Sequence, residues 1–293
     1  MKRKQLFLIL VLAAAVLLAV GVLLHRGNTR LTVSEYTLTL PALPHAFDGL
    51  RVVQISDLHD ACFGEGQSEL AAALAALQPD IIVFTGDLFD YKRLNLKNSL
   101  AAAEAAVNVA PCYYAPGNHE QRRPVQYAAL IRGLKALGVT VLDDAYAELT
   151  RGGESIRIAG ARDISFYEAN YSEEEIEYGD EHLAKTLWQI QLKTLCSGSD
   201  FTLLLSHHPE YFASYSGVGV QLVFSGHAHG GQFRLPFVGG LFAPGQGILP
   251  EYSEGVHSHQ GTVMVVSRGL GNSAFPLRVN NPPELVLAVL KSE

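Results

Sequence analysis

The chain has 293 residues, of which 48% are hydrophobic and 17% charged, and its formal net charge is −7. This acidic balance, with a pI of about 5.9, argues against a general nucleic-acid binder, which usually carries a basic stripe. The three cysteines (Cys62, Cys112 and Cys196) lack the spacing of metal ligands, and their odd number does not indicate a disulfide framework.

The first element in the chain is an apolar segment, residues 6–24, with no charge and no proline. As a helix it would be about 28 Å long, close to the thickness of the hydrocarbon core of a bilayer. A cleaved signal peptide is the alternative, but its apolar region usually has about 7–15 residues and is followed by a small-residue cleavage site. This run is longer and has no such site. We therefore expect an uncleaved membrane anchor over residues 1–30 and one domain over residues 31–293.

Basic residues flank the apolar segment on both sides, namely Lys2, Arg3 and Lys4 before it and Arg26 and Arg30 after it. Because positive charge is retained in the cytoplasm, the small excess at the first end predicts a cytoplasmic N-terminus and a domain outside the cytoplasm. Between Leu24 and the first predicted strand at Leu31, a fully extended chain reaches only about 20–25 Å. The domain is therefore expected to stay near the bilayer surface.

Beyond the anchor, strand-like runs alternate with helical segments. The predicted strands are residues 31–40, 51–56, 81–85, 112–115, 139–142, 145–149, 155–159, 201–206, 220–224, 262–266 and 285–290. The predicted helices are residues 68–77, 98–109, 127–137 and 181–195. Residues 164–180 are acidic and aromatic and are expected to form a solvated loop or lid. The alternation of strands and helices indicates the α/β class.

Five short polar clusters each follow a predicted strand, where ligands bind in layered α/β folds. They are Asp57 with His59, Gly86 with Asp87, Gly117 with Asn118, His119 and Glu120, Ser206 with His207 and His208, and Gly226 with His227 and His229. Mixed nitrogen and oxygen ligands suit divalent Mn, Fe or Zn better than Mg or Ca alone. Residues two apart on an extended chain face the same way, so each Asp-x-His or His-x-His pair is expected to close on one site.

Each cluster also has a simpler explanation. Asp-x-His is usually a turn, Gly-Asn-His could be only a left-handed turn, and His227 and His229 could lie on the surface. The presence of all five at strand ends, in this order, favours a shared site.

This order of motifs (D-x-H, G-D, G-N-H-E, H and G-H-x-H) resembles that of the calcineurin-like metallophosphoesterases, over about residues 50–290. Residues 227–236 and 267–278 are similar to the bacterial branch of membrane-associated or exported phosphoesterases. That branch includes relatives that act on UDP-2,3-diacylglucosamine. The resemblance implies a four-layer α/β/β/α sandwich that hydrolyses phosphate esters with two divalent metal ions (Mn, Fe or Zn).

The resemblance also implies a role for each residue. One metal would be held by Asp57, His59, Asp87 and His229, and the other by Asp87, Asn118, His207 and His227, with Asp87 bridging. His119 would face the scissile phosphate as general acid or transition-state stabiliser and would bind no metal. Since neighbours on an extended chain point to opposite faces, we expect His207 to be the ligand and His208 to lie near the substrate.

Several nearby residues have two possible roles. Arg122 and Arg123 could grip phosphate or could cap and solvate the helix that follows. Glu120 could orient His119 or a ligand, or could be a surface residue. His257 and His259 are expected in a surface loop.

Taken together, the sequence predicts a membrane-anchored, metal-dependent phosphoesterase for a phosphodiester or pyrophosphate bond. The anchor and the family branch imply the bilayer as a partner and a lipid or nucleotide-lipid substrate, such as UDP-2,3-diacylglucosamine; no nucleic-acid partner is expected. A nuclease of the same fold is one alternative, opposed by the acidic charge and the anchor. A non-catalytic binding or scaffold module is another, opposed by the complete ligand set and by His119.

Overall fold

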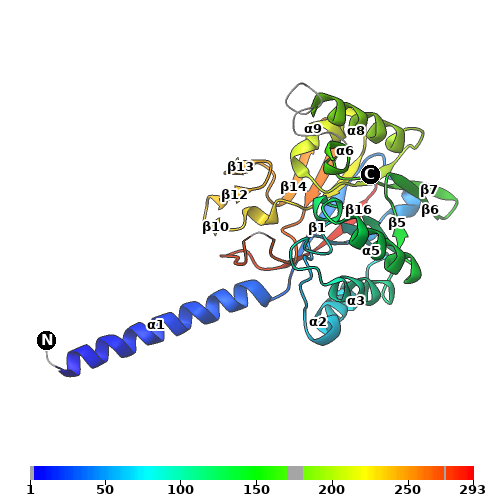
Figure 1. The fold of residues 1–293 in the computed structure, drawn as a ribbon. Helices are drawn as coiled ribbons and strands as arrows, with labels where there is room; N and C mark the ends of the chain where they lie inside the picture. Colours follow the sequence, from blue (N-terminus) through cyan, green and yellow to red (C-terminus); the bar gives the residue numbers. More distant parts are fainter. Residues whose placement is uncertain (1–2, 170–180, 274) are drawn as a thin grey trace.

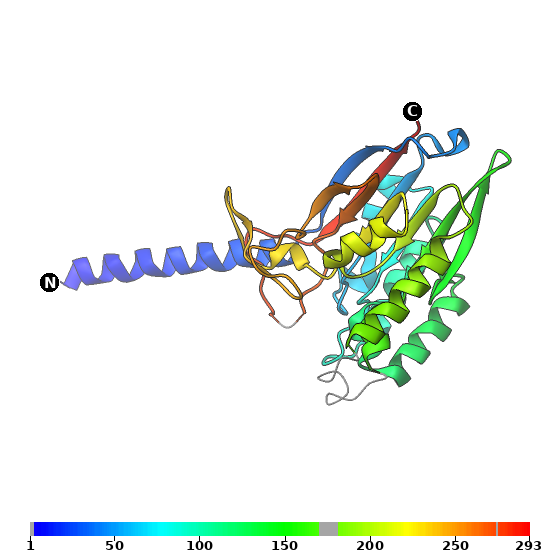
Figure 2. The same ribbon diagram turned by 90° about the horizontal axis from the view of Figure 1, so that it is seen from above.

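The computed structural model of the chain describes residues 3–169, 181–273 and 275–293. Its first element, α1 (Arg3–Thr29), leaves the rest of the molecule as a lone helix (Figures 1 and 2). Among the described residues it is the one helix that is long and apolar enough to cross a membrane, and none of its apolar window is buried in the protein. Because α1 continues to Thr29, the chain after Leu24 is helical rather than extended. At about 1.5 Å per residue, the domain begins closer to the apolar segment than an extended linker would allow.

The first sheet has six strands in the order β1-β16-β2-β3-β4-β5. Its strands are β1 (Thr32–Thr39), β2 (Arg51–Ile55), β3 (Ile81–Thr85), β4 (Cys112–Ala115), β5 (Thr140–Val141) and β16 (Glu284–Lys291). Strands β2 to β5 are parallel, and β16 joins them antiparallel to β2 and parallel to β1. The carboxyl ends of β2, β3 and β4 therefore meet at one edge, which brings three of the predicted motifs together.

The second sheet also has six strands, in the order β14-β15-β9-β8-β7-β6. Its strands are β6 (Ala145–Arg151), β7 (Glu154–Gly160), β8 (Thr202–Leu205), β9 (Leu222–Ser225), β14 (Gly255–His259) and β15 (Thr262–Val266). His257 and His259 lie on edge strand β14, so their prediction as loop residues is wrong. The run Gly-Val-His-Ser-His has little strand signal of its own, and its pairing with β15 gives it a strand's hydrogen bonds.

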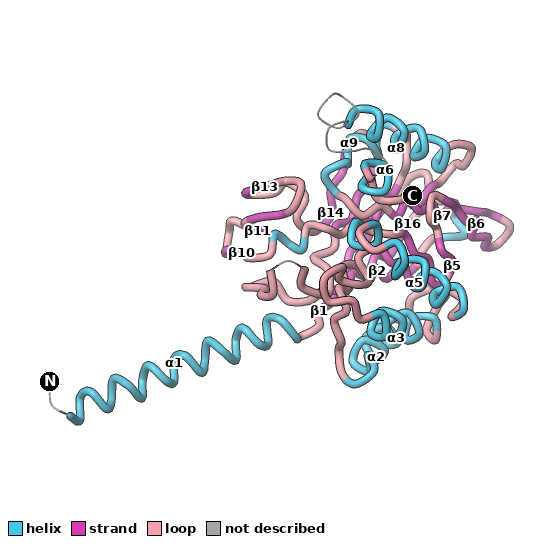
Figure 3. Tube along the Cα trace, in the orientation of Figure 1, coloured by secondary structure: helices cyan, strands magenta, loops and turns pink. Residues whose placement is uncertain are grey.

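Helices cover the outer face of each sheet (Figures 1 and 3). On the first sheet these are α2 (Ser68–Leu77), α3 (Leu96–Val107) and α5 (Pro124–Ala136); on the second they are α8 (Glu181–Cys196) and α9 (Phe212–Gly217). Buried side chains fill three interfaces, one between the sheets and one under each helical layer, as shown by Val83, Leu130 and Trp188 respectively. The predicted four-layer α/β/β/α sandwich is confirmed.

Some short elements differ from the sequence prediction. The loop or lid expected over residues 164–180 begins with a short helix, α6 (Ser165–Glu168), and residues 170–180 lie outside the described part of the chain. The remaining short helices are η1 (His45–Phe47), η2 (Glu65–Gln67), α4 (Asn118–Gln121), η4 (Pro209–Tyr211) and η5 (His229–Gly231). Between η5 and β14 the chain forms two small hairpins, β10 (Arg234–Leu235) with β11 (Gly239–Gly240) and β12 (Phe242–Ala243) with β13 (Gly247–Ile248).

Candidate metal centre

The loops that carry the predicted ligands turn sharply after their strands. Five of these residues have left-handed backbone conformations, with φ of 49° at Asp57, 45° at His59, 53° at Asp87, 63° at His227 and 47° at His229. The assumption of extended chain at the Asp-x-His and His-x-His pairs is therefore wrong. Such a conformation costs about 1–3 kcal/mol for a residue other than glycine. Bonds between neighbouring loops hold two of these turns: the Asp57 amide donates to the Gly86 carbonyl at 3.1 Å, and the His59 amide to the Asp87 carbonyl at 3.0 Å.

A first group of donor atoms belongs to Asp57, His59 and His229. The Nε2 atoms of His59 and His229 are 3.2 Å apart, and His229 Nε2 is 3.5 Å from Asp57 Oδ1. All three residues are buried, and each offers a ligand atom within 4.8 Å of the others. This spacing suits one cation.

A second group lies around His207, and Asp87 stands between the two groups. Oδ2 of Asp87 is 3.2 Å from His207 Nε2 and 3.6 Å from His59 Nε2. Nδ1 of His207 is 2.7 Å from the Thr85 carbonyl oxygen. A carbonyl only accepts hydrogen bonds, so Nδ1 carries a proton and Nε2 is left to face the carboxylates, as is usual for metal-ligating histidines.

The same region holds polar atoms that lack a protein partner. Asn118 Oδ1 and His207 Nε2 are buried and accept no hydrogen bond from any described residue. Leaving a buried polar atom unsatisfied costs about 1–3 kcal/mol. Two unpaired ligand atoms beside two carboxylates fit a site for divalent cations.

His227 and His229 belong to different groups although they are only two residues apart. The His227 ring stacks on His208 with centroids 3.8 Å apart, and His207, His208 and His227 bring ligand atoms within 4.8 Å of one another. His208 itself is held by two carboxylates: its Nε2 is 3.1 Å from Asp163 Oδ2, and its Nδ1 is 3.1 Å from a Glu210 oxygen. Burial lowers the pKa of His208, but these two negative charges outweigh burial and raise it above its ordinary value.

Three of the clustered imidazoles have a lowered pKa, which favours their neutral form. Burial lowers the pKa of His59 and His227 well below the ordinary histidine value, and burial together with the nearby Arg278 charge lowers the pKa of His229 to about 4. His207 differs, because the Asp87 carboxylate outweighs burial and raises its pKa. Neutral imidazoles beside carboxylates are the protonation states that metal binding requires.

His119 presents a proton donor to this centre. The backbone N–H of Tyr91 donates to His119 Nδ1 at 3.2 Å, so the ring proton of the neutral imidazole is on Nε2. Nε2 lies 3.8 Å from Asp87 Oδ2 and 3.3 Å from Ser273 Oγ. His119 thus has no lone pair on the nitrogen that faces the carboxylates.

Glu120 is a buried structural carboxylate and not a surface residue. It accepts hydrogen bonds from the backbone amides of Asp87 at 3.0 Å, Leu88 at 2.9 Å and Gly117 at 2.9 Å. It therefore ties the loop after β3 to the loop after β4. A side chain at Gly117 would collide with Asp87 Oδ1, which explains why this position is a glycine.

Two residues near the ligands were not predicted. Oδ2 of Asp90 is 3.7 Å from His59 Nδ1, on the side of the ring away from the centre. The guanidinium of Arg278 is almost wholly buried, and its Nη2 is 3.3 Å from His229 Nδ1. The motif order gives no sign of either contact, although Arg278 ends one of the two blocks that carry the resemblance.

The two candidate phosphate-binding arginines lie in different surroundings. Arg122 lines an open cleft of about 550 Å³ together with Asn118 and His227, and its guanidinium lies 4.6 Å from the centroid of the Tyr91 ring. Arg123 donates from Nε to the Tyr91 carbonyl at 2.9 Å and is not among the described residues that line this cleft. Of the two arginines, Arg122 is therefore the one that lines the cleft.

Residues 50–231 match the family model described as calcineurin-like phosphoesterase. The chain is 31% identical over 268 residues to the uncharacterized metallophosphoesterase YkuE of Bacillus subtilis, across 88% of this chain and 85% of that protein. It is 26% identical over 321 residues to the UDP-2,3-diacylglucosamine pyrophosphatase LpxG of Chlamydia muridarum, across 90% of each. It is also 26% identical over 247 residues to the phosphodiesterase YaeI of Escherichia coli, across 82% of each.

Proposed function

The chain belongs to the calcineurin-like phosphoesterase family, and from this premise we propose that it is a membrane-anchored enzyme with two metal ions that cleaves a lipid-linked phosphate ester. Membership makes it a metal-dependent phosphoric ester hydrolase. The bond would be a phosphodiester or a pyrophosphate. Similarity to a UDP-2,3-diacylglucosamine pyrophosphatase supports a nucleotide-lipid substrate, and the apolar α1 supports a substrate that resides in the bilayer.

The observation that carries this proposal is the position of Asp87 between two groups of buried donor atoms. We assign Asp57, His59, Asp87 and His229 to one metal, and Asp87, Asn118, His207 and His227 to the other. The mixture of imidazole, carboxylate and amide ligands favours Mn, Fe or Zn. His208, held by its two carboxylates beside the cleft, is assigned to the substrate.

The chain's own residues supply the remaining catalytic functions. When bound, a pair of divalent cations makes water a better nucleophile and neutralises phosphoryl charge. His119 holds its proton on Nε2, because the Tyr91 amide occupies Nδ1, and this N–H would donate a hydrogen bond that stabilises the negative charge developing on the leaving oxygen. Arg122 at the cleft binds the phosphate group. Glu120 fixes the backbone of Asp87 and Gly117, so that the bridging carboxylate keeps its position.

The proposed organisation has two parts. Residues 1–30 form the anchor and residues 31–293 the catalytic domain. The basic residues before α1 support an extracytoplasmic catalytic domain.

The test is hydrolysis of bis-p-nitrophenyl phosphate by the full chain in nanodiscs, after chelation and again after Mn is restored. Loss of hydrolysis after chelation, and its recovery when Mn is restored, supports the proposal. The substrate panel then includes UDP-2,3-diacylglucosamine, phospholipids, cyclic nucleotides and DNA. Preference for DNA would make the protein a nuclease of this fold, and absence of metal-dependent hydrolysis of any substrate would make it a binding module.

A further inference from the structure

The two hairpins between η5 and β14 carry large apolar side chains that point into solvent. We call this set the hairpin surface; its residues are Leu235, Phe237, Val238, Phe242, Ile248 and Leu249. Phe237 is fully exposed and Ile248 is 81% exposed. Contiguous exposed apolar patches of this kind mark sites of contact with proteins or membranes.

The hairpin surface lies beside the end of α1. Asn28, in the last turn of α1, donates from Nδ2 to the Arg278 carbonyl at 3.0 Å. The backbone amide of Arg234, in β10, donates to the carbonyl of the next residue, Val279, also at 3.0 Å. One short segment thus contacts the anchor helix on one side and the first hairpin on the other. Figures 1 and 2 show both hairpins on the side of the domain from which α1 departs.

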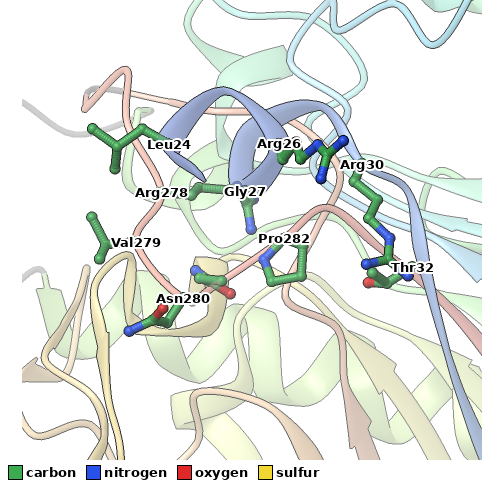
Figure 4. Close-up of a pocket in the computed structure, with 10 residues that line it drawn as sticks. Leu24, Arg26, Gly27, Arg30, Thr32, Arg278, Val279, Asn280 and Pro282 are labelled. Carbon is green, nitrogen blue, oxygen red and sulfur yellow. The ribbon is translucent and has the colours of Figure 1, made fainter. Parts of the chain in front are cut away.

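Positive charge is concentrated at the same junction. A pocket of about 520 Å³ lies between the last turns of α1 and residues 278–282 (Figure 4). Its walls are partly apolar, from Leu24, Val279 and Pro282, and it also contains Arg26 and Arg30. No described acidic side chain pairs with either arginine. Unpaired arginines next to apolar surface are suited to the level of anionic lipid headgroups.

We propose that the hairpin surface is a second membrane contact, which enters the same bilayer leaflet as the adjoining end of α1. The partner of this surface is a lipid bilayer, because the surface adjoins both an apolar helix and basic residues. Acyl chains of a bilayer contact apolar side chains, and its headgroups contact basic ones. This inference rests on the proposed membrane anchor.

The contact would fix the height of the metal centre above the bilayer. The Leu241 amide, between the hairpins, donates to the Gly231 carbonyl at 3.1 Å, and Gly231 belongs to the same short helix as His229. A single helix would let the domain swing about its attachment point, whereas two contacts set its tilt. The ligand loops are then held at a constant distance from lipid headgroups.

The test places tryptophan on the hairpin surface of the full chain in nanodiscs whose lipids are brominated in the acyl chains. The native Trp188 is the sole tryptophan and is buried, so it gives a constant background. The tryptophan fluorescence of F237W and I248W should be weaker in these nanodiscs than in nanodiscs of unbrominated lipid, because bromine quenches nearby tryptophan. The matched control is Y146W, because Tyr146 is exposed on β6, which lies far from α1 in both ribbon views.

The proposal is wrong if brominated lipid quenches the fluorescence of F237W and I248W no more than it quenches that of Y146W. A blue shift without quenching would place a protein, and not lipid, on this surface. Hydrolysis of bis-p-nitrophenyl phosphate by the same samples separates the two proposals. Hydrolysis without quenching refutes the membrane contact alone. Quenching without metal-dependent hydrolysis of this compound or any other substrate of the panel refutes the phosphoesterase function alone, and failure to enter nanodiscs refutes the anchor.

Discussion

Asp87 is the residue that lies between the two groups of donor atoms. Its Oδ2 is the carboxylate oxygen near His59 of the first group and His207 of the second. Its Oδ1 accepts the backbone N–H of His119 at 2.9 Å. One carboxylate thus links both proposed metal positions to His119, and a change of its charge should affect all three.

Asp87→Asn should reduce metal content and abolish turnover, because a neutral amide bridges two cations poorly. Metal analysis of the purified chain by mass spectrometry and hydrolysis of bis-p-nitrophenyl phosphate measure the two effects. Asp200→Asn removes a carboxylate from an exposed position and should change neither. A variant at Asp87 that retains two metals per chain and full turnover would show that the bridge is elsewhere.

His119→Ala tests the role of a residue that should act on the substrate and not on the metal. The turnover rate should fall by about 10²–10³, the usual cost of removing one hydrogen-bond donor that stabilises charge in the transition state. Metal content should stay at the level of His259→Ala, a control at an exposed histidine. The loss should shrink for substrates with good leaving groups, because less negative charge on the leaving oxygen then needs stabilisation. Loss of metal, with activity restored by added Mn, would instead make His119 a ligand.

At the scale of elements, the loops after β2 and β9 are packed against each other without space for a side chain. Gly226 follows β9, and a Cβ atom there would collide with Ser56 Oγ and Asp57 Oδ2. The Gly226 φ is not in the left-handed region, so the constraint is packing and not backbone strain. The absence of a side chain at Gly226 therefore allows Asp57 to approach the loop that carries His227.

Gly226→Ala should displace Asp57 and weaken metal binding. Overpacking of a close contact costs about 1–3 kcal/mol, so the free energy of unfolding should fall by that order as well. Metal analysis and thermal unfolding provide the measurements. Gly217→Ala, at the end of α9, meets no atom within 4 Å and serves as the control. Equal metal content in the two variants would show that the loops can separate without loss of the site.

The elements that sequence could predict are those whose apolar pattern matches their burial. Strand β3 and helix α2 have the predicted bounds, because β3 is a fully buried, mostly apolar run and α2 buries Leu70, Leu74 and Leu77 along one face. The hairpins β10 to β13 have two-residue strands and exposed apolar residues, so no periodicity marks them. Among site residues, the motifs predicted the donor atoms that the structure brings close together, whereas the positions of Asp90 and Arg278 depend on contacts between distant segments that no local pattern contains.

At the scale of the whole molecule, helix α1 and the proposed metal centre are connected through Arg278. Asn28 Oδ1 accepts the Arg278 backbone N–H at 2.7 Å, while the side chain of Arg278 reaches His229. The end of α1 therefore holds, through hydrogen bonds, the segment whose Arg278 contacts the proposed ligand His229. A soluble domain cut after α1 would lose this contact.

Asn28→Ala should lower both stability and turnover in the full chain. Each lost hydrogen bond is worth about 0.5–1.5 kcal/mol, and the Arg278 segment would be free to shift. The control is Thr29→Ala in the same turn, since among the described residues the Thr29 hydroxyl bonds within the helix, to the His25 carbonyl at 2.9 Å. Thermal unfolding and hydrolysis of a soluble substrate are the measurements. If Asn28→Ala behaves like Thr29→Ala, the anchor only tethers the domain.

The proposed orientation of the molecule in the membrane rests on charge at the two ends of α1. Three basic residues, Lys2, Arg3 and Lys4, stand on one side and two, Arg26 and Arg30, on the other. The excess predicts a cytoplasmic N-terminus and an external catalytic domain. The C-terminus follows β16 within the domain, so a tag placed there reports on the domain's side of the membrane (Figure 1).

Protease added to intact spheroplasts should therefore remove a C-terminal tag. Replacing Lys2, Arg3 and Lys4 by glutamine reverses the charge difference, and part of that population should become protected, because its basic residues would then lie only on the domain side. Complete protection of the unmodified chain until lysis would place the catalytic domain in the cytoplasm. The hairpin surface and the metal centre would then face the inner leaflet, and the substrate would have to be sought among cytoplasmic-leaflet lipids.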